Sequence, residues 1–281
     1  MARLDVKKTH KLYINGEFPR SESGRTFPAL DDSGGVIARM AEGSRKDLRD
    51  AVRAARNAQE KWAARTGYNR GQILYRVAEM VEDRVEVFID DLRSVGASKR
   101  AAEKEVDAAI DRLVWYAGWC DKFVQVYGNL NPVSGPFFNI SSPEPTGVVG
   151  VIAPSEPVLL GLVSRLAPVL VTGNTAVVVA SDTNPVVAVT FAEALATSDV
   201  PPGVVNILTG HAEELTPWLA SHMDVNAIDL TGADSGLIEA AEVAAADNVK
   251  RVIRSATPDA QSPLLIAAFT ETKTVWHPKG L

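Results

Sequence analysis

From Gly147 onward the sequence alternates between short apolar runs and longer segments with helical periodicity, and this alternation limits the fold more than any other feature. Runs such as GVVGVIA and NTAVVVA have the length and composition of strands that are buried on both faces. Five such strands separated by four helices predict a parallel sheet with right-handed crossovers, the layout of a dinucleotide-binding domain. No GxGxxG motif follows any strand, so the alternation alone predicts an α/β sheet without fixing its ligand. The expected helices are Val158–Leu170, Pro185–Thr197, Ala212–His222 and Asp234–Ala246, and NVKRVIR is expected as the last strand.

The preceding part of the chain reads as mainly helical. Its first helix has apolar residues at helical spacing, and the serine before it has the hydroxyl that a helix N-cap requires. A stretch rich in Pro, Gly, Asn and Ser follows the helices and contains the extended piece PFFNISS, which indicates a loop with strand character. The expected segments are a strand at Lys11–Phe18, helices at Ser44–Trp62 (N-cap Ser44), Arg70–Val95 and Ala101–Tyr127, and the loop Gly128–Pro145.

The end of the chain is unusual because a strand follows a polar linker. After Arg254 the stretch SATPDAQSP leads into LLIAAF and then ETKTVW, whose threonines, valine and tryptophan favour an extended strand over Phe269–Trp276. We expect this linker to be too polar for the core. A single strand cannot bury its own backbone groups, so it must pair with a strand of this chain or of another.

Composition excludes several classes of function. The formal net charge is −6 and the basic residues are scattered, so we expect no nucleic-acid surface. No apolar run is long enough to span a membrane, and the N-terminal sequence MARLDVKKTHKLYING has no apolar core typical of a signal peptide. The single cysteine, Cys120, cannot form an internal disulfide; we predict a buried, inert thiol and a cytoplasmic location. The four histidines are too widely spaced for a metal site.

Several long motifs, in order, resemble the coenzyme-binding part of aldehyde dehydrogenases. They run almost continuously from about Leu12 to Arg251, and the terminal ETKTVW resembles the last strand of the oligomerisation arm of that family. The resemblance implies a Rossmann-like parallel α/β sheet with flanking helices and a small β oligomerisation arm. The segment that carries the catalytic domain and its nucleophilic cysteine in that family is missing between the two parts. The motifs are YINGEF, PALDDSGGVIARMAEGS, AVRAARNAQEKWA, YAGWCDK, EPTGVVGVIAP, RLAPVLVTGNTAVVVASDTNP, PPGVVNILTG and LTG.

On this resemblance we divide the chain into four parts. Residues 12–127 form the N-terminal strand and helical part of a coenzyme-type domain, and residues 128–146 form the hairpin of the arm. Residues 147–254 form the Rossmann-like sheet, and residues 255–281 form a linker and the C-terminal oligomerisation strand.

Three positions depart from the chemistry of the family. Glu156 stands where the resemblance places the asparagine that binds the oxyanion, and a carboxylate there would repel the oxyanion. Val179 replaces the lysine that binds the adenosine ribose, and Ser255 replaces the glutamate that acts as general base. Together with the missing cysteine segment, these changes predict that the chain has no catalytic residues.

Cofactor binding is left open by the sequence. Thr231 and Gly232 match the turn at which a helix N-terminus approaches the pyrophosphate in the family, but the same two residues also suit a strand-to-helix turn with no ligand. Glu156 and Asp234 would add negative charge near a phosphate, so we expect no NAD binding or only weak binding. The candidate cofactor-binding residues are Ile152, Ala153, Pro154, Ser181, Gly210, Thr231 and Gly232.

Two functions remain as hypotheses. The first is a non-catalytic subunit whose β arm adds to the sheet of a full-length aldehyde dehydrogenase, with a homo-oligomer as the competing assembly. The second is a protein of the NAD(P)-binding oxidoreductase type that keeps some nucleotide binding or activity in the crevice of its sheet. Neither hypothesis requires a metal, a nucleic acid or a membrane.

Overall fold

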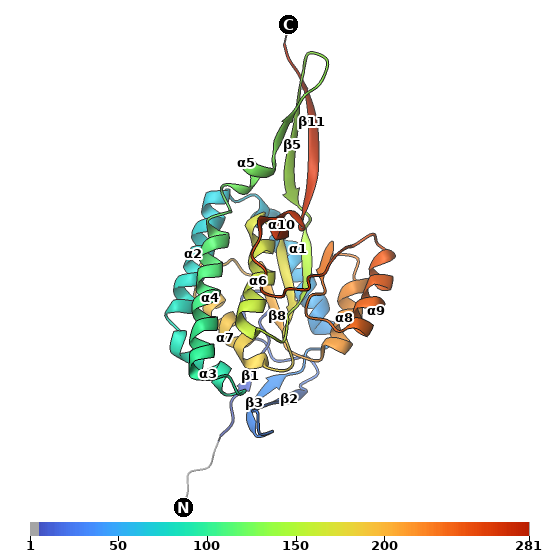
Figure 1. Cartoon of the computed structure of the whole chain (residues 1–281). Helices are drawn as coiled ribbons and strands as arrows, with labels where there is room; N and C mark the ends of the chain where they lie inside the picture. The colour runs from blue at the N-terminus through green and yellow to red at the C-terminus, as the bar shows by residue number, and fades with distance from the viewer. Residues whose placement is uncertain (1–5, 281) are drawn as a thin grey trace, which may run out of the picture.

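The computed structural model describes residues 6–280 and is built around a five-stranded parallel sheet (Figure 1). The strand order is β10-β9-β6-β7-β8, so the chain enters at the middle of the sheet and extends it first to one side and then to the other. The predicted Rossmann-like sheet with flanking helices and a small β arm is thereby confirmed. Of the N-terminal residues that argued against a signal peptide, 1–5 lie outside the described range. The strands are β6 (Val148–Ile152), β7 (Thr175–Val179), β8 (Val205–Leu208), β9 (Ala227–Asp229) and β10 (Arg251–Ile253).

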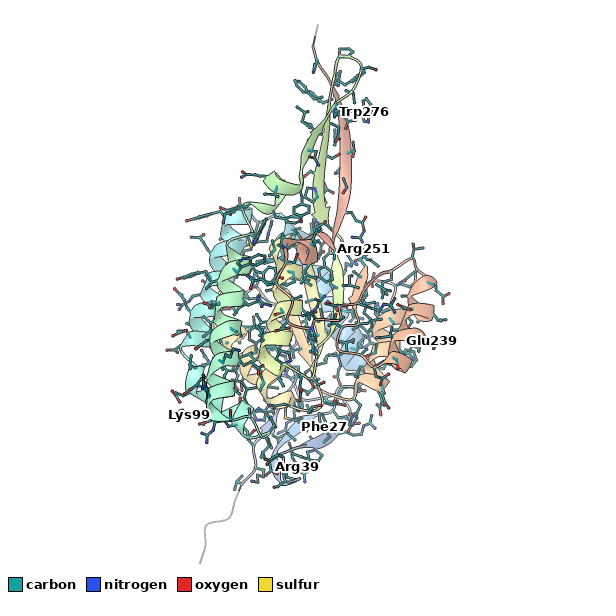
Figure 2. All side chains as sticks on the ribbon, in the orientation of Figure 1. Phe27, Arg39, Lys99, Glu239, Arg251 and Trp276 are labelled. Carbon is teal, nitrogen blue, oxygen red and sulfur yellow. The ribbon has the colours of Figure 1, made fainter. Side chains whose placement is uncertain are left out.

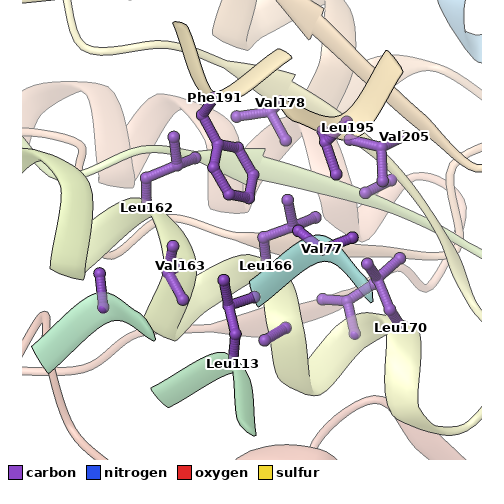
Figure 3. Packing of buried hydrophobic residues seen from close by; sticks show 14 of the residues in the cluster. Val77, Leu113, Leu162, Val163, Leu166, Leu170, Val178, Phe191, Leu195 and Val205 are labelled. Atoms are coloured by element: carbon purple, nitrogen blue, oxygen red, sulfur yellow. The ribbon is translucent and has the colours of Figure 1, made fainter. Parts of the chain in front are cut away.

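Helices cover both faces of the sheet, which explains why its strands are apolar throughout. In β6 and β7 alternate side chains enter two separate cores: Val149 and Val178 face one, and Val148 and Val177 face the other. The first core contains the side chains of α2, α4, α6 and α7, where Phe191 and the leucines of α6 interdigitate (Figure 3). The second core is covered by α1, α8 and α9. The crossover helices are α6 (Val158–Val171), α7 (Pro185–Ala196), α8 (Ala212–Ser221) and α9 (Ser235–Ala246), each within two residues of its predicted bounds.

The N-terminal part is helical as predicted, but two of the predicted helices are each broken into two. The helix expected at Ser44–Trp62 is confirmed, and Ser44 caps it in a capping box with Asp47. The apolar periodicity continues across the breaks, and this is why the sequence pattern merges the helices. The first break lies at Asp83–Arg84 and the second begins at Gly118, where α4 ends. The helices are α1 (Arg45–Ala63), α2 (Gly67–Glu82), α3 (Val85–Arg93), α4 (Lys99–Ala117) and α5 (Phe123–Tyr127).

The prediction of one continuous strand at Lys11–Phe18 is wrong. The segment folds back on itself at Asn15 and Gly16, which both have positive φ angles, as in the Asn-Gly turns that join tight hairpins. Tyr13 alone bridges to the main sheet, at Ile207. A separate small sheet of order β1-β3-β2 lies nearby (Figure 1). Its strands are β1 (Thr9–His10), β2 (Thr26–Leu30) and β3 (Val36–Ala41).

The arm is a three-stranded antiparallel sheet that projects from the domain at the end opposite β1, β2 and β3 (Figure 1). Its order is β11-β5-β4, with β4 at Asn129–Asn131, β5 at Phe137–Pro145 and β11 at Thr270–Pro278. The C-terminal strand therefore finds its first partner within the chain, in a register that pairs all nine of its residues with β5. The predicted strand is confirmed, and the expectation that it pairs with a strand is met by the chain's own hairpin.

The polar part of the linker before β11, residues 255–263, lies outside the core as predicted, with no buried residue. The apolar stretch that follows it is different. It contains the short helix α10 (Pro263–Ala267), and Ile266 and Phe269 are completely buried in the first core. Phe269 thus belongs to the domain and not to the projecting strand. Its carbonyl oxygen accepts hydrogen bonds from the Asn174 amide (2.9 Å) and from the Thr146 N–H (3.2 Å), which fixes the base of the arm.

Candidate functional site

The strands of the parallel sheet all end at one edge, and every predicted cofactor residue lies at such an end. Because β9, β6 and β7 are neighbours, the structure brings the residues that follow these three strands together. Gly210 is separate: it follows the edge strand β8, where a Cβ atom would lie 3.1 Å from Leu215 and 3.2 Å from the Gly43 nitrogen. The placements are Ile152, Ala153 and Pro154 at the end of β6, Ser181 after β7, Gly210 after β8, and Thr231 and Gly232 after β9.

The turn after β9 packs directly on the backbone that follows β6. The Gly232 N–H donates to the Ile152 carbonyl at 3.1 Å, and a Cβ atom at position 232 would lie only 2.3 Å from the Ala153 oxygen. Only glycine allows this approach. Gly232 therefore has a structural role that needs no ligand.

Thr231 has both of its hydrogen-bond donors engaged within the chain. Its N–H (3.0 Å) and its hydroxyl (2.5 Å) both donate to Oδ1 of Asp229. The other carboxylate oxygen accepts from Nε of Arg165 at 2.7 Å, and neither Arg165 nor Asp229 has any exposed side-chain surface. This buried ion pair was missed in the sequence, although an aspartate at the end of an apolar strand was the available signal.

The N-terminus of α6, which lies just after the β6 end, is capped by a carboxylate from another helix. Oε1 of Glu105 accepts from the Leu159 N–H at 2.7 Å and the Leu160 N–H at 3.2 Å. Burial raises the pKa of Glu105, and the nearby carboxylates of Glu156 and Asp259 add to this rise against the opposing effect of the two amides. Donors that could bind an anion at this helix end are thus already occupied by an internal one.

The N-terminus of α9 is also capped by a carboxylate. The side chain of Asp234 accepts from the Leu237 N–H at 2.8 Å and so caps this helix. Two helix N-termini at the carboxyl edge of the sheet therefore each carry a carboxylate.

The positions that depart from the family pattern do not form a reactive cluster. Glu156 is exposed, whereas Val179 is fully buried in the second core and offers no donor. The hydroxyl of Ser255 donates to the Thr257 carbonyl at 2.9 Å and accepts from the Thr257 N–H at 3.2 Å, so it shapes a turn of the linker.

Cys120 lies away from this edge, beside the start of α2, where its carbonyl is close to Gly67. The residue is only 3% exposed, which confirms the predicted burial. Burial raises the pKa of its thiol to about 12, so the thiolate that a nucleophile requires is not formed near neutral pH. Among the described residues, no group of three His, Cys, Asp or Glu side chains could hold a metal ion.

The outer edge of the arm is a second candidate site. Trp276 lies towards its tip and Arg251 at its base (Figure 2). The Lys279 N–H donates to the Pro136 carbonyl, and this pair continues the register in which β11 pairs with β5. The odd-numbered residues of β11 therefore direct their backbone N–H and C=O groups towards β5. The alternate residues, such as Thr272 and Thr274, then direct theirs outward. Within residues 6–280 no strand pairs with this outer edge.

The arm also exposes large apolar side chains on its faces. Val275 is 47% exposed and Trp276 is 59% exposed. Ile140, which is opposite Val275 in the register, is 47% exposed, and Leu130 on β4 is 67% exposed. Such a cluster on a projecting element is typical of a surface that another chain covers.

Comparison with known proteins agrees with this architecture. The model of the aldehyde dehydrogenase family matches residues 19–273. The chain belongs to the aldehyde dehydrogenase family. It is 34% identical over 256 residues to cytosolic aldehyde dehydrogenase 1 of Elephantulus edwardii, and 34% identical over 252 residues to the mitochondrial aldehyde dehydrogenase of Rattus norvegicus. These alignments cover 88% and 86% of this chain but only 50% and 47% of the relatives, so the chain spans about half their length.

Solved structures of the family share the fold. HpcC from Thermus thermophilus matches with a TM-score of 0.83 and 30% identity over 88% of this chain and 48% of that protein. An aldehyde dehydrogenase from Bacillus cereus, solved as an NAD+ complex, matches with a TM-score of 0.82 and 27% identity over 88% and 50%. The predicted family is therefore confirmed. No helix within residues 6–280 has the length and apolar character needed to cross a membrane.

Proposed function

We propose that this chain is a non-catalytic member of the aldehyde dehydrogenase family that assembles through its β arm with a full-length aldehyde dehydrogenase. The observation that supports this most directly is the unpaired outer edge of β11. This strand has nine residues and is the longest strand at a sheet edge in the described chain. An edge of this length with apolar neighbours is a template for strand addition. The cytoplasmic location remains a prediction.

The proposed absence of catalysis is supported by the burial of the single cysteine and by one residue at the carboxyl edge of the sheet. Cys120 is buried beside α2, and Glu156 brings a carboxylate where an oxyanion would need donors. We infer that the purified chain oxidises no aldehyde with NAD or NADP. Turnover that disappears in a Cys120→Ser variant would overturn this inference.

The residues at the carboxyl edge of the sheet, where folds of this type bind nucleotides, fit a dinucleotide poorly. The donors of Thr231 are taken by Asp229, and the N-termini of α6 and α9 are capped by Glu105 and Asp234. A pyrophosphate would have to displace these groups or approach their negative charge. Relatives bind NAD+, so some binding in the crevice is the second candidate function, and the complete parallel sheet favours it. Micromolar NAD binding by calorimetry would support this second function over weak or absent binding.

A proline substitution at Thr272 tests assembly without removing the arm. Proline at an edge strand is tolerated where its missing N–H would face solvent, but it blocks a hydrogen bond to an added strand. The Thr272→Pro variant should stay folded and fail to co-elute with the co-expressed partner aldehyde dehydrogenase. The Thr272→Val variant keeps the N–H and is the matched control, which should still associate.

Two outcomes would separate the alternatives. If Thr272→Pro assembles as well as the control, the outer edge of β11 is not the interface and the proposal fails. If the chain forms a dimer of itself that Thr272→Pro abolishes, and ignores the full-length enzyme, the arm pairs two copies and the hetero-oligomer is wrong. Size-exclusion chromatography with light scattering distinguishes these species by mass.

A further inference from the structure

A cavity of about 650 Å³ lies between the start of α1 and the end of α8, two helices that contact each other. It is lined by residues that none of the functions above uses. Its volume lies within the range of sites for small molecules, about 300–1,000 Å³. The lining combines cations with apolar groups.

The charge of the cavity is opposite to that of the protein. Three cationic side chains, Arg45, Lys46 and Arg49, line it against the single carboxylate of Glu22, although the chain as a whole has a net charge of −6. Lys46 contacts Glu22 at 3.1 Å, and Arg49 contacts the adjacent Asp50 at 3.1 Å; all four side chains are at least 41% exposed. Exposed ion pairs of this kind are weak, so an anionic ligand can compete with these carboxylates for the cations.

Arg45 is the cation best prepared for a ligand. Its guanidinium carbon lies 3.8 Å from the centre of the Trp218 ring, and among the described residues no carboxylate pairs with it. Stacking on an aromatic face fixes the plane of a guanidinium and leaves its N–H groups free at the rim. A planar fork of N–H donors matches the oxygens of a phosphate or carboxylate.

The apolar part of the lining indicates the rest of the ligand. Trp218 is 42% exposed and Met223 is 73% exposed, and Leu48 lies deeper at the floor. These side chains offer an aromatic edge and a flexible thioether, which adapts to irregular apolar shapes. The carboxyl edge of the sheet contributes none of these residues, so the cavity is distinct from the candidate cofactor residues at that edge.

We propose that this cavity binds a small anionic ligand that joins a phosphate or carboxylate to an aromatic or apolar group. The anion binds the N–H fork of Arg45 with Lys46 and Arg49 beside it, and the apolar group rests on Trp218 and Met223. The proposal stands independently of assembly through the arm.

Phenyl phosphate is a suitable probe, titrated calorimetrically into the full chain at low ionic strength. It should bind saturably, with benzyl alcohol and inorganic phosphate each at least about ten-fold weaker, because each offers only half of the interactions. Arg45→Met and Arg49→Met should each weaken binding by about ten-fold, since each removes a charged hydrogen bond. Glu22→Gln should tighten binding, because it removes the competing carboxylate from Lys46.

The matched control is Arg53→Met, which removes an exposed cation of the same helix outside the cavity and should leave affinity unchanged. Thermal melts of all variants verify that they are folded. The proposal is overturned if phenyl phosphate shows no saturable binding, if inorganic phosphate binds equally well, or if Arg53→Met weakens binding as much as Arg45→Met. Weaker binding in Glu22→Gln would also contradict an anionic ligand.

Discussion

Replacement of Asp229 by alanine should destabilise the protein far more than an average substitution. Asp229 accepts from Arg165 at 2.7 Å and from the N–H and hydroxyl of Thr231, and neither member of the ion pair is exposed to solvent. The variant would leave a guanidinium in the core without a counter-charge. Breaking one partner of a buried pair costs about 3–5 kcal/mol. At roughly 2–4 °C per kcal/mol for a domain of this size, the Tm should fall by about 6–20 °C.

A double-mutant cycle shows whether the unpaired charge is the cause. Arg165→Met alone should also destabilise, because it leaves the Asp229 carboxylate buried without its cation. The variant with both Arg165→Met and Asp229→Ala should recover much of the loss, since replacing a whole buried pair by apolar groups is often close to neutral. Urea unfolding followed by circular dichroism gives the free energies. A loss below about 1 kcal/mol in Asp229→Ala, or additive losses in the double variant, would refute the reasoning.

Three other predictions concern Gly232, Glu105 and the thiol of Cys120. Gly232→Ala should cost about 1–3 kcal/mol in urea unfolding, because its Cβ would meet the Ala153 oxygen at 2.3 Å; a neutral effect would mean that the two turns separate easily. Burial raises the pKa of Glu105, so its contribution to stability is complete below the ordinary pKa of 4.5 and is lost as the pH rises through the pKa of the folded protein. The free energy of unfolding of the wild type, relative to that of Glu105→Gln, should therefore fall as the pH rises from 4.5 through the folded pKa. A difference between the two proteins that does not change with pH would contradict the raised pKa. Cys120 should react with a thiol reagent at pH 8 only after denaturant is added, and rapid reaction of the native protein would disprove its burial.

The parallel sheet could be predicted from sequence because burial on both faces leaves a plain signal. Strands such as β6 and β7 are surrounded by helices, so every residue in them is buried, and only an apolar run satisfies that requirement. The helix breaks at Asp83 and Gly118 were missed because amphipathic periodicity reports which face is buried and not where the axis turns. The Asn-Gly dipeptide alone predicts the turn at Asn15–Gly16. The strand-like pattern on both sides of it led instead to the prediction of a single strand.

The chemistry of the candidate site was predictable only in part. Residues that follow strands could be placed at one edge, since parallel strands all end on the same side. The partners of those residues could not, because Asp229 and Arg165 are 64 positions apart and Glu105 reaches α6 from a helix 54 positions away. Such contacts depend on tertiary packing. The same applies to the linker, where Phe269 is anchored by Asn174 in spite of the polar residues before it.

The polar groups near the carboxyl edge of the sheet and those on the outer edge of β11 differ in whether they have partners within the chain. Near the carboxyl edge of the sheet, Asp229 accepts from Thr231, Glu105 caps α6 and Asp234 caps α9, so these donors have partners within the chain. These donors therefore do not depend on a ligand for a partner. The outer edge of β11 is different, because its outward backbone groups have no partner strand in the described chain. The donors near the carboxyl edge thus have partners within the chain, whereas the proposed assembly depends on the unpaired outer edge of β11.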